Sequence, residues 1–169
     1  MRNILFRGKR LDNGQWIYGG YFKHDTVKVC FTSDDPKTKH YIVCDSFCDW
    51  GMEPQPEYFE VEPETVCEWT GLVDKHNEMI FERDILHGPW NWTYPEKMYF
   101  SIFWRDMDAG FWCHCFRAHE VEVIGNHVDH PGLLCHLNDG GALENYVKPC
   151  CEQRSDFQCQ TLKKPASNT

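Results

Sequence analysis

The residues best suited to chemistry are a short run of thiols and imidazoles, Cys113-His114-Cys115, followed by His119. Zinc in proteins is held by about four thiolate, imidazole or carboxylate ligands in a tetrahedral array. In a strand, Cys113 and Cys115 point to the same side, so further ligands must come from elsewhere, for example Cys135. One hypothesis is therefore a zinc site drawn from Cys113, Cys115, His119 and Cys135, or a histidine-assisted enzyme around Cys113–His119.

Packing is the competing explanation for these thiols. The chain has ten cysteines, but no two of them are separated by two residues, the spacing most typical of zinc sites. Cysteine is also a small apolar residue that packs well in β cores, and Cys44 and Cys67 lie in strand-like surroundings. No export signal precedes the first strand, which favours reduced thiols. We therefore expect no cofactor.

Other catalytic patterns are missing from the sequence. There is no Gly-x-Ser-x-Gly elbow and no glycine-rich phosphate loop. Glu82 and Asp84 are two residues apart and could share a strand face, but such a pair is more typical of a solvated strand edge. We expect no catalytic residues and no enzymatic activity.

The amino-acid composition limits the classes of partner that the protein is expected to bind. The 169 residues carry a formal net charge of −9, and 15% of them are aromatic, which indicates a folded acidic protein. Seven tryptophans and eleven phenylalanines could form a stacking platform for nucleic acid, but such platforms also need a basic groove. A nucleic-acid adaptor therefore remains only an alternative. No apolar run approaches the length of a membrane span, so we expect a cytoplasmic protein without membrane contact.

The hydrophobic pattern is that of short strands. Alternating residues on both sides of Asn13-Gly14 predict a hairpin, because both residues accept a positive φ. A short helix is expected after Asp129 or His130, with Pro131 at a first helical position before Leu133 and Leu134. Further strands are predicted at 26–32, 40–45, 58–61, 99–104, 111–116 and 121–124. A bend is expected at Gly19-Gly20. The residues after about 138 are expected to form a weakly ordered tail with a helical piece at 142–147.

Aromatic side chains also occur in a predicted loop. Trp90, Trp92 and Tyr94 follow the chain break at Gly88-Pro89, and indoles in a loop are typical of interaction surfaces. Together with the exposed edges expected of short strands, they predict a homo-oligomer or a protein partner.

Several segments resemble one known family. They are Ile4-Leu-Phe-Arg-Gly8, a strand at Trp16–Gly19, Thr70-Gly-Leu-Val-Asp-Lys-His-Asn-Glu-Met-Ile-Phe-Glu-Arg-Asp-Ile85 and Val123-Ile-Gly-Asn-His-Val-Asp-His-Pro-Gly-Leu-Leu134. In order and spacing, this set resembles the YopX family of phage and prophage proteins. The resemblance covers residues 1–136, with 137–169 as a tail. It implies a mainly β pseudo-barrel of short antiparallel strands and hairpins, capped by a small helix, and it implies no reaction.

Two positions depart from the family pattern, because Asn77 and Arg83 stand where glycine is usual. Asparagine tolerates the left-handed region, so we expect the hairpin at Asn77 to survive. For Arg83 we expect a slightly remodelled turn. The resulting prediction is a phage- or prophage-encoded accessory protein of the bacterial cytoplasm that acts by protein binding or self-association.

Overall fold

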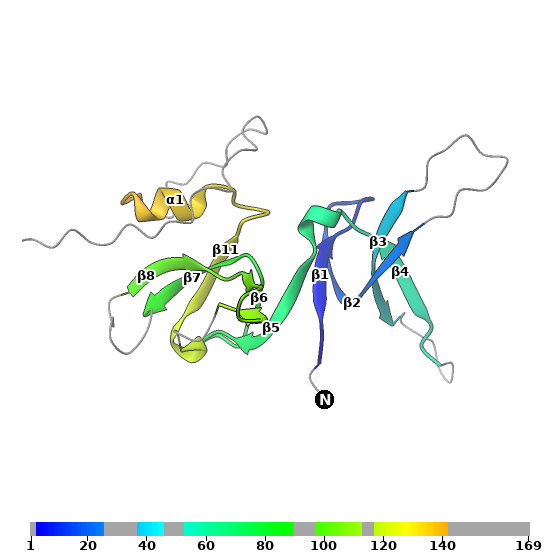
Figure 1. Ribbon diagram of the computed structural model, residues 1–169, viewed down its shortest axis with the longest axis horizontal. Helices are drawn as coiled ribbons and strands as arrows, with labels where there is room; N and C mark the ends of the chain where they lie inside the picture. Colours follow the sequence, from blue (N-terminus) through cyan, green and yellow to red (C-terminus); the bar gives the residue numbers. More distant parts are fainter. Residues whose placement is uncertain (1–2, 26–36, 46–52, 90–96, 113–116, 142–169) are drawn as a thin grey trace, which may run out of the picture.

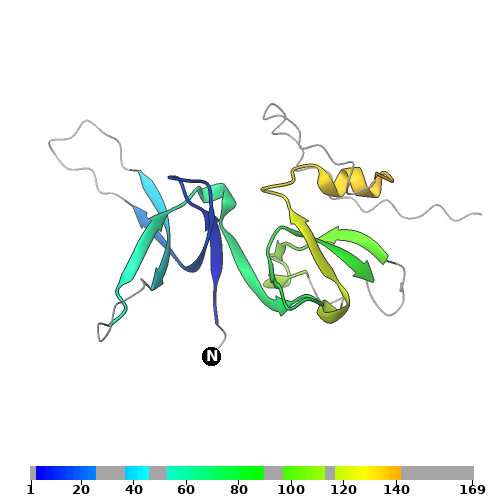
Figure 2. The same ribbon diagram turned by 180° about the vertical axis from the view of Figure 1, so that it is seen from behind.

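The computed structural model describes residues 3–25, 37–45, 53–89, 97–112 and 117–141. Its main element is a six-stranded sheet of order β4-β3-β2-β1-β5-β6, which we call the large sheet. In both views the strands β1 to β4 lie on one side of the molecule, and β5 leads from them to the remaining strands (Figures 1 and 2). The bounds are Phe6–Lys9 (β1), Trp16–Asp25 (β2), Thr38–Asp45 (β3), Pro56–Glu60 (β4), Cys67–Val73 (β5) and Met79–Phe81 (β6).

A second, three-stranded sheet, the small sheet, has the order β11-β7-β8. Every strand pairing in the described ranges is antiparallel. The mainly β class with one small helix is therefore confirmed. The remaining elements are η1 (Pro63–Thr65), β7 (Asp84–Pro89), β8 (Lys97–Ser101), β9 (Trp104–Arg105), β10 (Gly110–Phe111), η2 (Ala118–Glu120), β11 (Glu122–Asn126) and α1 (Leu133–Asn138).

The predicted hairpin at Asn13-Gly14 is confirmed as the connection between β1 and β2. Gly14 has a φ of 68°, and its amide donates to the carbonyl of Arg10 over 2.9 Å. The side-chain oxygen of Asn13 accepts a hydrogen bond from the amide of Gln15, so it completes the turn.

The large sheet curls but stays open. After β4 the chain reaches back to the end of β1, where Arg10 and Val61 form an isolated bridge and the amide of Leu11 donates to Glu60. The two edge strands of the sheet are β4 and β6. The described strands therefore form no closed barrel, and the pseudo-barrel stays a prediction.

Two apolar clusters lie around the small sheet. One is built from β6, β7, β8 and neighbouring segments and contains Ile80, Leu86, Phe100, Ile102, Phe111 and Val121. The other joins Ile85 of β7 to Leu133 and Leu137 of α1. The predicted helix is thus confirmed. It begins after Gly132, which has a φ of 83°, so Pro131 precedes the helix and does not open it.

The other predicted elements have mixed outcomes. The strands expected at 40–45, 58–61 and 121–124 correspond to β3, β4 and β11. The single strand expected at 99–104 is wrong in detail, because β8 ends at Ser101 and pairs with β7, whereas Trp104 belongs to the hairpin β9–β10. The segments 26–32, 113–116 and 142–147 lie outside the described residues, as does most of the predicted tail.

Both non-glycine positions in the family pattern have positive φ. Asn77, at 65°, lies in the intact turn after Asp74, as predicted. Arg83 has a φ of 67°, so the expectation of a remodelled turn is wrong. Its amide donates to Ile102 over 2.7 Å and its carbonyl accepts from His127 over 3.0 Å, and these two bonds hold the left-handed conformation.

This conformation predicts a difference between two variants of Arg83. Arg83→Gly and Arg83→Ala both remove the hydrogen bond from the guanidinium to the carbonyl of Glu64. Only the glycine variant relieves the left-handed strain, so we expect it to be about 1 kcal/mol more stable than the alanine variant. Urea unfolding of the pair measures the difference. Equal stability would show that the conformation carries no strain.

Candidate functional site

The segments that carry the family resemblance meet where the two sheets join. We call this contact the junction, and it consists of Arg7, Lys9, Trp16, Phe81, Asp84, Asn126 and Asp129. At its centre the guanidinium of Arg7, on β1, forms an ion pair with the carboxylate of Asp84, on β7. Asp84 is fully buried and also accepts the amide of Phe81 over 2.8 Å. The prediction that Asp84 lies at a solvated strand edge is therefore wrong.

Aromatic rings enclose the buried cation. The guanidinium carbon of Arg7 lies 4.7 Å from the ring centroid of Trp16 and 4.6 Å from that of Phe81. Such contacts stabilise a desolvated cation through the negative faces of the rings. Burial raises the pKa of Asp84 to about 6, although Arg7 acts in the opposite direction.

Asp129 forms the second half of the junction, in the turn between β11 and α1. Its carboxylate accepts hydrogen bonds from Lys9, from the indole of Trp16 over 2.8 Å and from Asn126 over 3.0 Å. Partial burial opposes ionisation, but these three donors outweigh it and lower the pKa of Asp129 to about 2. The same asparagine accepts the amides of Val128 and Asp129, so it shapes the turn.

A second polar cluster surrounds Glu122 on β11. Its carboxylate pairs with Lys75 and lies 2.9 Å from Nδ1 of His87, whose ring stacks on Tyr99 with centroids 4.7 Å apart. Hydrogen bonds from Lys75 and His87 lower the pKa of Glu122 to about 2. The neighbouring Asp74 accepts the amides of His76 and Glu78, which closes the turn before β6, and also the amide of Val123 on β11.

The pairing of Glu122 predicts acid sensitivity. Its pKa is lowered from 4.5 to about 2, so its contribution to stability is complete above about pH 4.5 and is lost as the pH falls toward 2. We expect this loss to be about 1–2 kcal/mol, because the carboxylate is partly solvated. Glu122→Gln should flatten the curve of unfolding free energy between pH 5 and 3. An unchanged slope would show that the carboxylate gains nothing from its partners.

One serine–histidine pair was missed by the sequence reasoning. Oγ of Ser101 lies 2.9 Å from Nε2 of His127, and burial, with a smaller contribution from Arg83, lowers the pKa of this imidazole. Because Ser101 is only 3% exposed, substrate could not reach its hydroxyl without opening the fold. The pair therefore satisfies buried polar groups and does not form a nucleophilic site.

The predicted zinc ligands are only partly described. Cys113 and Cys115 lie outside the described residues. His119 is exposed and lies 3.6 Å from Glu120, and Cys135 is half-buried near the start of α1. Within the described ranges no group of three or more histidine, cysteine or acidic residues could hold a metal. Cys44 and Cys67 occupy strands β3 and β5, and Cys67 is buried, as the packing explanation predicts.

The large sheet exposes a cluster of aromatic rings. Phe22, Tyr41 and Tyr58, from β2, β3 and β4, lie with ring centroids 6.4–6.5 Å apart. We call these three residues the aromatic face. Phe22 is 46% exposed and Tyr58 is 57% exposed. The sequence shows the alternation that places these rings on one side of the sheet, but not that this side remains uncovered.

The predicted interaction residues Trp90, Trp92 and Tyr94 lie outside the described residues. In the parts of the chain that the structure describes, no helix has the length and apolarity that crossing a membrane requires.

The fold and the junction together define a small antiparallel β protein. Its two sheets are held together by residues from the segments that carry the family resemblance. The YopX protein family model matches residues 5–135, so the chain belongs to the YopX family. A comparison with curated proteins gave no match.

Proposed function

We propose that this protein acts by binding other proteins, including copies of itself, and not by catalysis. The observation that carries the proposal is the aromatic face, because exposed clusters of large apolar side chains mark interaction sites more often than random surface does. Phenylalanine and tyrosine are also enriched in protein interfaces.

The junction supports the same proposal. The charged groups that resemble family motifs are already engaged in the fold, since Arg7 is paired with Asp84 and Asp129 with Lys9. Groups occupied in this way are poorly available for proton transfer to a substrate. The likeness to phage and prophage proteins leads us to propose an accessory role in the bacterial cytoplasm.

Self-association is proposed from the open strand edges. The outer sides of β6 and β8, and that of β4 before Glu60, end their sheets in the described structure. Trp90, Trp92 and Tyr94 stay our predicted contact residues for a second copy. The native mass of the reduced protein over a range of concentrations tests this part. We expect a defined multiple of the 20.0 kDa subunit. A subunit mass at every concentration would contradict self-association.

Native mass measurement also tests the zinc hypothesis, because a bound metal adds its own mass. If the native protein carries the added mass of a zinc ion and Cys113→Ala lacks it, Cys113 is a zinc ligand. That result would contradict a role in protein binding alone.

A further inference from the structure

The turn between β1 and β2 contains the one asparagine of the sequence that is followed by glycine, Asn13-Gly14. Residues 11–15 are all exposed, and a Cβ atom at Gly14 would meet no other atom within 4 Å. Glycine has no side chain that hinders its own amide nitrogen from approaching the preceding residue. Both water and the Gly14 nitrogen can therefore reach the side-chain amide of Asn13.

The hydrogen bonds of the turn act on this side chain in two ways. Oδ1 of Asn13 accepts from the amide of Gln15 over 2.9 Å, which holds the side-chain carbonyl beside the Gly14 peptide. The same donor stabilises negative charge that develops on Oδ1 when a nucleophile attacks the carbonyl carbon. One bond opposes the attack, because the amide of Gly14 donates to the carbonyl of Arg10 over 2.9 Å. The Gly14 nitrogen is therefore well placed to react once this single bond opens.

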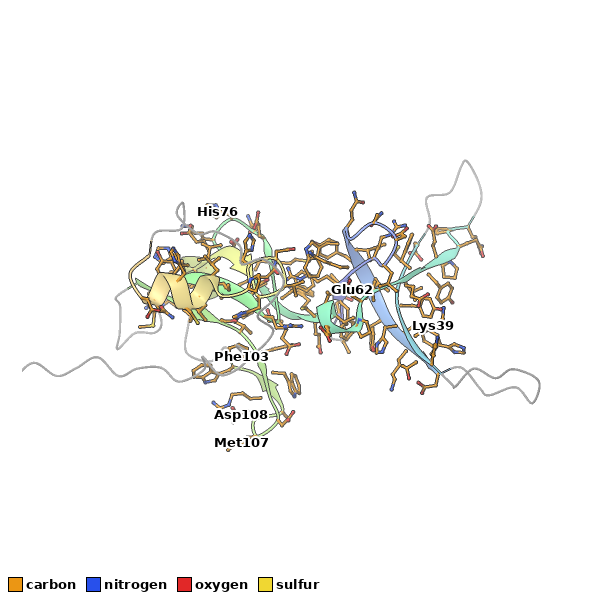
Figure 3. The ribbon with its side chains drawn as sticks, turned by 90° about the horizontal axis from the view of Figure 1, so that it is seen from above. Lys39, Glu62, His76, Phe103, Met107 and Asp108 are labelled. Atoms are coloured by element: carbon orange, nitrogen blue, oxygen red, sulfur yellow. The ribbon has the colours of Figure 1, made fainter. Side chains whose placement is uncertain are left out.

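The same turn is joined to the contact between β1 and the end of β4, which we call the seam. The seam consists of Lys9, Arg10, Leu11, Phe59, Glu60, Val61 and Glu62. The amide of Leu11 donates to Glu60 over 3.0 Å, and the amide of Glu62 donates to Lys9 over 2.9 Å. Along the length of the molecule, Glu62 lies between α1 and Lys39 of β3 (Figure 3). The seam therefore lies near the middle of the protein, where it holds β4 against β1.

Arg10 belongs to both the turn and the seam. In the turn, its amide donates to the carbonyl of Gln15 over 3.0 Å and its own carbonyl accepts from Gly14. In the seam, its main chain forms the bridge with Val61, and its guanidinium carbon lies 4.3 Å from the ring centroid of Phe59. A change in the main chain of the turn therefore displaces a residue on which the seam depends.

We propose that Asn13 deamidates spontaneously in the folded protein and that its isoaspartate product loosens the seam. This covalent modification goes beyond the proposed binding function and does not depend on it. The amide nitrogen of Gly14 gives its proton to solvent base and bonds to Cγ of Asn13, and the side-chain nitrogen leaves as ammonia with a proton from water. Water then opens the cyclic imide, its hydroxyl adding to one of the two carbonyl carbons and its proton to the ring nitrogen. The products are aspartate and isoaspartate.

The isoaspartate product alters the main chain at residue 13. The chain then runs through Cβ and Cγ, so it gains a methylene group, and the former main-chain carbonyl becomes a free carboxylate. The bonds from Gly14 to Arg10 and from Arg10 to Gln15 both span residue 13, so we expect the longer chain to break them. Aspartate at this position keeps the normal main chain and an acceptor for the amide of Gln15, so we expect it to preserve the turn.

Peptide mapping of the full-length reduced protein after incubation in mildly alkaline buffer tests the chemical step. Trypsin releases residues 11–23 as one peptide with Asn13 as its only asparagine, and chromatography with mass spectrometry separates its three forms. Asn126 is the internal control, because its Oδ1 also accepts two backbone amides but a histidine follows it. We expect Asn13 to react at least about tenfold faster than Asn126. Equal rates, or no isoaspartate at residue 13, would overturn the inference.

Incubation in urea separates the folded protein from the unfolded chain. The bond from Gly14 to Arg10 must open before the folded turn reacts, so we expect Asn13 to react about fivefold more slowly in buffer than in urea. Reaction in urea alone would overturn the inference, because deamidation would then be a property of the unfolded chain.

Residue-resolved amide hydrogen exchange tests the effect on the seam. It compares fresh protein, the purified isoaspartate form and Asn13→Asp, the matched control that adds the same charge without lengthening the main chain. We expect the amides of Leu11 and Glu62 to exchange at least about tenfold faster in the isoaspartate form and within about twofold of fresh protein in Asn13→Asp. Unchanged exchange in the isoaspartate form, or equal acceleration in Asn13→Asp, would overturn the proposed loosening of the seam.

Discussion

Replacing Asp84 by alanine is expected to lower the free energy of unfolding by about 3–5 kcal/mol. The change leaves the guanidinium of Arg7 buried without its anion, and an uncompensated buried charge costs this much. The amide of Phe81 also loses its acceptor. Urea unfolding followed by tryptophan fluorescence gives the value. A loss below 1 kcal/mol would show that water or another group replaces the carboxylate.

A double-mutant cycle measures the interaction energy between Arg7 and Asp84 separately from the contacts that each side chain makes with other residues. Arg7→Ala leaves Asp84 buried and unpaired, and it also empties the space between Trp16 and Phe81. The double variant removes both charges, so it should cost clearly less than the sum of the single variants, with a coupling of about 1–3 kcal/mol. Additive losses would mean that the two side chains stabilise the junction independently.

The same carboxyl group predicts a pH dependence. Burial raises the pKa of Asp84 from 3.8 to about 6, so the folded protein binds more protons than the unfolded chain between these values. The contribution of this group is therefore fully present below about pH 4 and decreases as the pH rises toward 6. His127, whose pKa is lowered, contributes with the opposite sign in the upper part of this range. Comparison with Asp84→Asn isolates the carboxyl group, because that variant lacks this slope.

Replacing Gly19 by alanine is the second change with a large expected effect. A Cβ atom at Gly19 would lie 2.1 Å from the carbonyl oxygen of Val43 and 2.8 Å from its carbonyl carbon. Both atoms belong to the backbone of β3, so relief requires the strands to move apart. We expect a loss of about 3 kcal/mol or more, since backbone shifts at a buried position exceed the usual cost of overpacking.

Gly20→Ala is the matched control for this change. A Cβ atom at Gly20 would lie 3.9 Å from the same carbonyl oxygen, which is ordinary contact, and Gly20 is exposed. We expect an effect within about 1 kcal/mol. Thermal and urea unfolding of both variants measure the difference. Similar losses in the two variants would contradict a specific close approach at Gly19.

Gly19 and Gly20 show which structural features the local sequence can predict and which it cannot. Gly19-Gly20 predicts a bend, and at this pair β2 does change partners, from β1 at Gly19 to β3 at Gly20. The dipeptide does not indicate which glycine a neighbouring backbone approaches. That distinction depends on the position of Val43, which lies on another strand.

The candidate site was predictable to a similar extent. Alternation fixes which residues of a strand share one side, but the pairing of Phe22 with Tyr41 is known only from the register of β2 and β3 in the structure. The exposure of Phe22 and Tyr58 could not be predicted, because strand alternation does not show which side of a sheet is covered by other elements. Ser101 and His127 are likewise joined through the packing of β8 beside the turn after β11, and no spacing in the sequence indicates their contact.

The sequence by itself determined the mainly β class, the turn at Asn13-Gly14, the presence of a small helix after Pro131 and the family. These features depend on local periodicity, on residues that tolerate positive φ and on the order of short motifs. Only the tertiary structure decided the role of Asp84, whose partner Arg7 is 77 positions away in the chain. A carboxylate in an alternating segment is usually solvated, and here a buried cation from another sheet makes its burial possible.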